Sequence, residues 1–363
     1  MNEEKLKALR EKYANAKGAE GFSGKFKEIA DALFSEDNSR AKPYAGISSL
    51  LDLPVQETAA GLDIALIGVP MDLGVTNRPG ARFGPRAVRQ IERIGPYNHV
   101  LEVSPQTLCK AADIGDVPFR SRFSLDDSIE DITNFYREVL ATGARVLSVG
   151  GDHSITYPIL KAVAEKEPVA LIHIDAHCDT SGEYDGSKFH HGAPFRMATL
   201  DGLIDPEHTI QIGIRGSAEF LWEFSYESGM TVIHAEEFER MGVDAVIAKA
   251  RAVVGDMPVY ITFDVDALDP AFAPGTGTPE VGGLTSREAL ALLCGLKGLP
   301  VIGGDVVEVA PQYDANTTTA QVGGQLLFEI FCLMAMNVAQ SEVKALRTDP
   351  RSQSEAPGDC YEP

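Results

Sequence analysis

Carboxylate and imidazole side chains follow an apolar segment in the middle of the chain. Residues 170–174 read Ala-Leu-Ile-His-Ile, and Asp175, His177 and Asp179 come next at two-residue spacing. Because side chains alternate along a strand, residues two apart point the same way, so these three are expected to face a common site. Carboxylate and imidazole together suit hard and borderline divalent cations. The spacing therefore predicts a metal site.

Two more segments repeat this arrangement. Asp264 and Asp266 come at the end of an apolar run, and His153 follows the run 146–149 within Gly-Gly-Asp-His-Ser. In parallel α/β sheets, sites are built at the carboxyl ends of strands. One such motif fits a strand end or a helix cap equally well, but three together favour a two-metal site. The candidate ligands are His153, Asp175, His177, Asp179, Asp264 and Asp266.

Two histidines and a glutamate complete the candidate site. His190 and His191 lie in a polar loop after Asp179, where an imidazole is suited to proton transfer near neutral pH. Glu308 ends the apolar run 301–307, where a carboxylate can pair with a planar guanidinium. A solvated loop histidine and a strand-end salt bridge are the alternatives. The charges of two divalent ions would balance the negative charges of the four aspartates. A cationic substrate would balance the negative charge of a hydroxide.

Composition limits the class of protein. The chain has 363 residues, of which 44% are hydrophobic and 23% charged, as in an ordinary globular protein. A net charge of −21 argues against nucleic acid or an anionic membrane surface as a partner. Five cysteines without paired spacing predict no disulfides and a cytoplasmic location. We expect neither a signal peptide nor a segment apolar enough to span a membrane.

Apolar runs alternate with amphipathic segments along most of the chain. The expected strands are residues 63–70, 146–149, 170–174, 209–214, 231–234, 259–263 and 301–307. The expected helices are residues 125–141, 154–165, 218–227, 243–254, 286–295 and 318–336, with another from about residue 87. This alternation predicts an α/β fold with a parallel sheet covered on both faces.

The chain is expected to divide into three segments. Residues 1–62 form an N-terminal extension, helical within 1–36 and an ordered loop over 37–62, that packs on the domain or on a neighbouring subunit. Residues 63–340 form one α/β domain, and residues 341–363 form a tail that frays from Asp349. The basic loop 74–86 lacks P-loop spacing, so we expect it to shape the site mouth or a subunit contact.

These motifs together resemble the ureohydrolases, the arginase and agmatinase family. The matching segments are residues 150–154, 175–179, 191–192, 263–270, 275–279 and 306–311. The resemblance implies a three-layer, arginase-like α/β/α domain with a parallel central sheet and a centre of two Ni²⁺ or Mn²⁺ ions. It implies one ion on His153, Asp175, Asp179 and Asp264, and the other on Asp175, His177, Asp264 and Asp266. Asp175 and Asp264 would bridge the two ions.

The activity implied is hydrolysis of a guanidino C–N bond. Hydroxide generated by two ions about 3.5 Å apart would attack the guanidino carbon held by Glu308. His191 would relay protons between the site and bulk water. We therefore expect His191, Asp179 and Glu308 to be catalytic, and Glu308, His190 and His191 to bind the substrate.

Substrate choice rests on the loops. Residues 180–184 lack the asparagine-containing segment that grips an α-amino acid in arginases, which disfavours arginine. Residues 78–82, Arg-Pro-Gly-Ala-Arg, are similar to the agmatinase-type branch, and the extension and loop 186–192 are most similar to its guanidine- and metformin-hydrolase-like members. We expect guanidine, an alkylguanidine or a biguanide such as metformin, giving urea or guanylurea and an amine. Agmatine, giving putrescine and urea, and guanidinobutyrate are the alternatives.

Assembly follows from the same resemblance. It implies a homo- or hetero-oligomer, a trimer or a hexamer. Because this chain keeps all six ligands, it would be the catalytic subunit of a heteromer, and a catalytically silent scaffold subunit is the alternative. A binuclear phosphoesterase is disfavoured because the site lacks the arginine or lysine cluster that a phosphate needs.

Overall fold

An eight-stranded parallel sheet forms the centre of the protein. The computed structural model describes residues 2–34, 45–91 and 95–348. The strands are β1 (Ile64–Val69), β2 (Ala111–Asp116), β3 (Arg145–Gly150), β4 (Val169–Ile174), β5 (Ile204–Ile214), β6 (Thr231–His234), β7 (Val259–Asp264) and β8 (Val301–Val307). Their order across the sheet is β2-β1-β3-β8-β7-β4-β5-β6. Strands β1, β4 and β7 are buried throughout, as expected for apolar strands covered on both faces.

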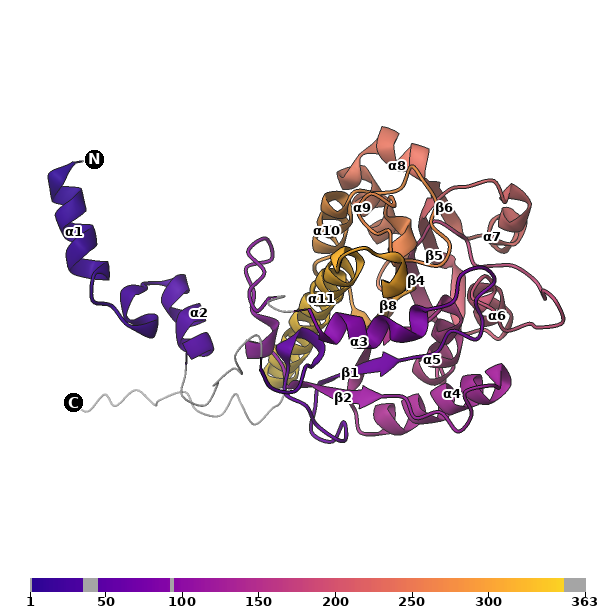
Figure 1. The fold of residues 1–363 in the computed structure, drawn as a ribbon, viewed down its shortest axis with the longest axis horizontal. Coiled ribbons are helices and arrows are strands. Elements are labelled where there is room, and N and C mark those ends of the chain that lie inside the picture. The colour runs from indigo at the N-terminus through magenta and orange to yellow at the C-terminus, as the bar shows by residue number, and fades with distance from the viewer. Residues whose placement is uncertain (1, 35–44, 92–94, 349–363) are drawn as a thin grey trace, which may run out of the picture.

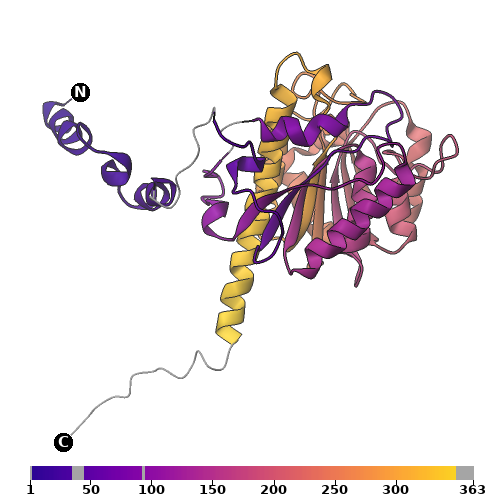
Figure 2. The same ribbon diagram turned by 60° about the horizontal axis from the view of Figure 1, so that its bottom comes forward.

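Helices cover both faces of this sheet (Figures 1 and 2). One apolar core includes α4 (Leu125–Ala141), α5 (Thr156–Val163) and α6 (Pro194–Leu200). The other includes α3 (Gly84–Arg89), α8 (Ala235–Met241), α9 (Val243–Val254), α10 (Ser286–Gly295) and α11 (Thr318–Thr348). The short helix α7 (Glu223–Ser228) packs beside β5 and β6. The predicted three-layer α/β/α fold is therefore confirmed.

Three elements are absent from the prediction. Strand β2 lies at the edge of the sheet and contains Asp113, Gly115 and Asp116, so it lacks the apolar run that marks the central strands. Helices α6 and α8 have seven residues each, which is too short to show a helical period. Helix α3 starts at Gly84 rather than near residue 87, because Pro85 is well accommodated in a first helical turn.

The N-terminal extension contains two helices, α1 (Glu3–Tyr13) and α2 (Lys25–Phe34), which stand away from the α/β body in Figures 1 and 2. Helix α1 has no buried residue. An ion pair between Lys25 Nζ and Glu102 Oε1, 2.6 Å apart, links α2 to the body. Packing on a neighbouring subunit stays a prediction. The expected loop 37–62 lies partly outside the described residues, as does the tail from Asp349.

Helix α11 runs past residue 340 to Thr348. Its segment Thr318–Ser341 is long and apolar enough to cross a membrane by length and composition, so the expectation that no segment is so apolar is wrong. However, 72% of its apolar window is buried inside the protein, where the helix packs against β8 and β3. This burial is that of a core helix.

Candidate metal centre and active site

The order of the strands brings the predicted ligands together. Strands β3, β8, β7 and β4 are neighbours in the sheet, and each carries candidate residues at its carboxyl end. His153 follows β3, Glu308 follows β8, Asp264 ends β7, and Asp175 follows β4. Parallel strands present these ends at one edge of the sheet, so residues far apart in the chain share one site.

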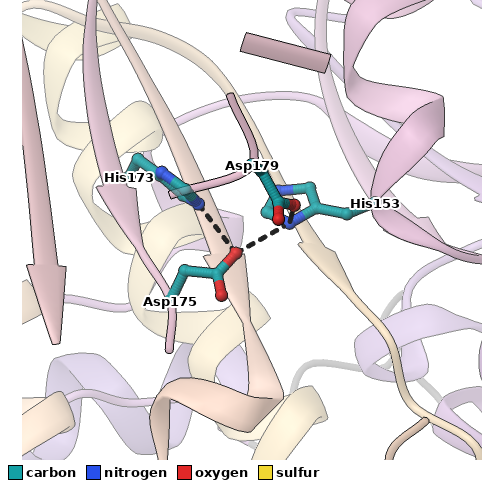
Figure 3. A group of neighbouring side chains, drawn as sticks. All are labelled: His153, His173, Asp175 and Asp179. Atoms are coloured by element: carbon teal, nitrogen blue, oxygen red, sulfur yellow. Dashed lines mark hydrogen bonds and ion pairs between the residues drawn. The ribbon is translucent and has the colours of Figure 1, made fainter. Parts of the chain in front are cut away.

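His153 lies at the centre of the first group of ligands. Its Nδ1 atom is 3.0 Å from Asp175 Oδ2, 3.0 Å from Asp179 Oδ2 and 3.4 Å from Asp264 Oδ2. Figure 3 shows the imidazole directed at the carboxylates of Asp175 and Asp179. The His153 Nδ1 atom is buried and has no hydrogen bond of acceptable geometry among the described residues. Such an atom, surrounded by carboxylate oxygens, fits a metal ligand.

A second group forms around His177. Its Nδ1 atom is 3.2 Å from Asp266 Oδ2 and 3.5 Å from Asp175 Oδ1. The two oxygens of Asp175 therefore face different histidines, which is the arrangement of a bridging carboxylate. Asp264 Oδ1 instead accepts a hydrogen bond from the Asp266 backbone nitrogen at 2.8 Å. The predicted bridging role of Asp264 stays a prediction.

Buried negative charge dominates this edge of the sheet. Asp175, Asp264 and Asp266 are at most 2% exposed. Burial, and then the carboxylates of Asp266 and Asp175, raise the pKa of Asp264 well above its usual range. Buried carboxylates at this density need a compensating cation. The donor set therefore fits two divalent ions.

Two site residues have left-handed backbone conformations. Asp179 has φ +50° and Glu308 has φ +65°, a region that residues other than glycine, asparagine and aspartate rarely adopt, so Glu308 is the more unusual of the two. Such strain is stored where the surrounding structure holds a functional geometry. Glu308 is the first residue after β8 and Asp179 lies five residues after β4, and the carboxylates of both contact His153, that of Glu308 through the backbone nitrogen.

Glu308 and His191 contact each other although they are 117 residues apart in the chain. Glu308 Oε1 accepts hydrogen bonds from His191 Nδ1 at 2.8 Å and from the His153 backbone nitrogen at 3.0 Å. Burial opposes the imidazolium, but the Glu308 carboxylate outweighs it and raises the pKa of His191 to about 9. The Glu308 Oε2 atom is buried and has no partner among the described residues. One carboxylate oxygen is thus left for another donor.

Thr76 is a site residue that sequence reasoning missed. Its backbone nitrogen is 3.1 Å and its hydroxyl 2.6 Å from His191 Nε2, so both ring nitrogens of His191 have partners inside the protein. The loop that carries Thr76 is fixed by Arg78, whose guanidinium donates to the carbonyls of Thr276 and Gly277. The predicted role of loop 74–86 in shaping the site is therefore supported by these contacts.

A cavity of about 430 Å³ opens onto the cluster. Its lining includes His177, Asp179, Asp264, His190 and His191 from the predicted site, and Thr76, Glu183, Tyr184, Phe220, Trp222 and Glu280 from outside it. His190 Nε2 donates to the Gly182 carbonyl at 2.8 Å, and its Nδ1 atom has no partner among the described residues. Glu308 is not among the lining residues, but its Oε1 atom contacts His191, which is.

His173 and Cys178, which lie in the same segment as the candidate ligands, are both buried. His173 is fully buried and has a hydrogen-bond partner, since its Nε2 atom lies 2.7 Å from Asp175 Oδ2. Cys178 is 3% exposed, and burial raises the pKa of its thiol to about 12. The thiol therefore stays protonated at neutral pH and is a poor nucleophile.

Comparison with known proteins identifies the family. A profile described as the Arginase family matches residues 62–332. The chain belongs to the arginase family. It is 48% identical to guanidinopropionase of Pseudomonas aeruginosa over 309 residues, covering 84% of this chain and 97% of that protein. It is also 48% identical to mitochondrial agmatinase of Gallus gallus over 298 residues, covering 81% of this chain and 87% of that protein.

A solved structure agrees with this assignment. Proclavaminate amidino hydrolase from Streptomyces clavuligerus superposes with a TM-score of 0.78 at 38% identity, covering 82% of this chain and all of that one. The predicted agmatinase-type branch is confirmed by these relatives, whereas special similarity to metformin hydrolases is not shown. This arginase-family member is a metal-dependent amidinohydrolase, an enzyme that cleaves C–N bonds of amidino groups.

Proposed function

We propose that this arginase-family enzyme hydrolyses a linear guanidino compound whose far end is also positively charged, agmatine being the model substrate. The observation that carries the proposal is the charge of the cavity. Glu183 and Glu280 line it beyond the ligand cluster, together with the aromatic rings of Tyr184, Phe220 and Trp222. Carboxylates and aromatic faces both attract an ammonium group.

The same cavity offers little to a substrate that ends in a carboxylate. Of the described residues that line it, only Arg215 carries a permanent positive charge. Its guanidinium already donates to backbone carbonyls of Gly213, Asp266, Ala267, Leu268, Glu280 and Val281. The relatives at 48% identity include both a guanidinopropionase and an agmatinase, so cavity charge is the feature that favours agmatine.

Each step of the proposed reaction uses residues already placed. Two divalent ions held by the six ligands would acidify a water molecule so that hydroxide forms near neutral pH. Glu308 Oε2 accepts N–H donors of the guanidinium, which orients the guanidino carbon toward the ligand cluster. Hydroxide adds to the guanidino carbon, and Asp179 and His191 would pass the proton of the added hydroxyl to the leaving amine nitrogen as its C–N bond breaks. Water and agmatine are thereby converted to urea and putrescine.

A substrate panel tests the proposal. Protein loaded with Mn²⁺ or Ni²⁺ is incubated with agmatine, 4-guanidinobutyrate, 3-guanidinopropionate, guanidine and metformin, and urea, guanylurea and amines are quantified. We expect agmatine to give the highest kcat/KM. A higher kcat/KM for either guanidino acid contradicts the proposal that the far end of the substrate is positively charged. A higher value for guanidine or metformin supports the choice predicted from the sequence, which the relatives do not test.

Metal identity is decided by the same assay. A histidine and carboxylate site binds Ni²⁺ more tightly than Mn²⁺, but the cellular supply of each metal also decides which one is present. Activity after loading with each ion, at equal measured occupancy, ranks the two.

Replacing Glu280 by glutamine should separate substrates by charge. The Glu280 side chain is 37% exposed, so its attraction for an ammonium is screened, and we expect KM for agmatine to rise roughly two- to fivefold. KM for 4-guanidinobutyrate should stay constant or fall. Glu236→Gln, on the exposed surface of α8, is the matched control and should change neither value. Equal changes in KM for both substrates would show that Glu280 does not recognise the ammonium end of agmatine.

A further inference from the structure

A row of five polar side chains crosses the sheet beneath the ligand cluster. Their register pairs each with the next: Ser148 with Asp305, Asp305 with Thr262, Thr262 with His173, and His173 with Gln211. The row spans β3, β8, β7, β4 and β5. Each member is 0% exposed, and buried apolar residues of the same strands surround it. Burying polar groups here costs free energy unless every hydrogen bond is made, so the row calls for an explanation.

The row lies directly under the predicted ligands. Thr262 precedes Asp264 by two residues and His173 precedes Asp175 by two, so each pair is on the same face of the sheet. The ring of Phe195, from α6, is 4.2 Å from that of His173 and 5.2 Å from that of His153. Phe195 is fully buried, so it shields these histidines from water.

Hydrogen bonds from Asp305 through Thr262 determine which ring nitrogen of His153 carries the proton. The Asp305 carboxylate accepts from the hydroxyls of Thr262 at 2.5 Å, Tyr260 at 2.8 Å and Thr156 at 2.9 Å. Thr262 has one hydroxyl proton, and Asp305 receives it. The contact of 2.8 Å between Thr262 Oγ1 and His153 Nε2 must then have the imidazole as donor. A neutral His153 therefore presents the lone pair of Nδ1 to the cluster.

In the same way, Gln211 determines which ring nitrogen of His173 carries the proton. Gln211 Nε2 donates to the Cys178 carbonyl at 2.6 Å, which fixes the orientation of the amide. The same nitrogen is 3.0 Å from His173 Nδ1, which must therefore be the acceptor. His173 carries its proton on Nε2 and donates it to Asp175 Oδ2 at 2.7 Å. His173 thus orients a ligand and has no lone pair left for a metal.

We propose that four of the five residues in this row support the metal centre, with Thr262 and Asp305 positioning His153 and with Gln211 and His173 positioning Asp175. Metal-binding histidines and carboxylates need such partners to hold their orientation. The inference rests on the proposed metal centre and adds four positioning residues to it. Ser148, in the same row and equally buried, bonds the Tyr136 hydroxyl instead of a ligand, which makes it the matched control.

Metal affinity of the full-length protein tests this role. The protein is stripped with a chelator, and Mn²⁺ binding is measured by isothermal titration calorimetry for wild type, Thr262→Val, Thr262→Ser, Gln211→Leu and Ser148→Ala. We expect Thr262→Val and Gln211→Leu to weaken Mn²⁺ binding about 10- to 100-fold, and Thr262→Ser to restore it. Ser148→Ala should lower the Tm and leave Mn²⁺ affinity unchanged.

The outcomes separate the two proposals. A wild-type protein that binds no Mn²⁺ or Ni²⁺ contradicts the metal centre itself. Wild-type binding that Thr262→Val and Gln211→Leu leave unchanged, or that Ser148→Ala weakens equally, overturns the positioning role. Should the two variants not fold, neutron diffraction of the wild type decides, since hydrogen is expected on Nε2 of both His153 and His173. Hydrogen on Nδ1 of either residue would contradict the assignment.

Discussion

Replacing Asp175 by alanine is expected to abolish both metal retention and activity. Asp175 is the residue whose two carboxylate oxygens face both histidine groups, one toward His153 and one toward His177. Loss of a partner that only orients a ligand costs about 10- to 100-fold, so loss of a shared ligand should exceed about 100-fold. The measurement is metal content per chain after desalting, with the kcat of the metal-loaded protein measured in parallel.

A variant of a distant aspartate is the control for this prediction. Asp256→Ala, at an exposed position outside the cluster, should keep wild-type metal content and kcat. Removing Asp175 also leaves His173 Nε2 and the His177 backbone nitrogen without their acceptor, so the metal-free variant should be less stable than metal-free wild type. If Asp175→Ala retained two ions per chain, the bridging role assigned to it would be wrong.

Replacing Glu308 by glutamine should have a different signature, with metal kept and turnover lost. The Glu308 Oε2 atom is buried and unpartnered beside the cluster, so it is the acceptor available to a guanidinium. Removing one charge of a buried, hydrogen-bonded pair costs about 2–5 kcal/mol, which corresponds to a roughly 30-fold to 5,000-fold loss in kcat/KM. Steady-state kinetics with agmatine measures this loss.

Metal content is the control for that variant. Glutamine keeps an oxygen that can accept from the His153 backbone nitrogen, so the ligand loop should stay in place and two ions should bind as in wild type. Wild-type kcat/KM in Glu308→Gln would show that Glu308 does not bind the substrate. Lost metal would show instead that Glu308 supports the centre.

The clustering of the candidate ligands was predictable because its signal is local. Asp175, His177 and Asp179 follow one strand at two-residue spacing, and the parallel fold places them next to the ends of β3 and β7. A central apolar strand followed by polar residues can be recognised without knowing its neighbours. Edge strand β2 lacks that contrast, because its polar residues interrupt the apolar pattern.

Contacts between distant parts of the chain were not predictable. The two ring nitrogens of His191, which was expected to exchange protons with bulk water, contact Thr76 and Glu308, and these partners lie more than a hundred residues away on either side. No local pattern encodes such pairs. The polar row was hidden for the same reason, since His173 and Thr262 each look like an isolated exception in an apolar strand until the register pairs them.

The central claim, that six residues at neighbouring strand ends hold two divalent ions, is tested most directly by anomalous diffraction from crystals grown with Mn²⁺. The account predicts two peaks about 3.5 Å apart, with Asp175 between them and His153 and His177 on opposite sides. Each peak should lie within bonding distance of its histidine through Nδ1. The absence of any peak at this edge of the sheet, or a peak bound by His173, would contradict the account.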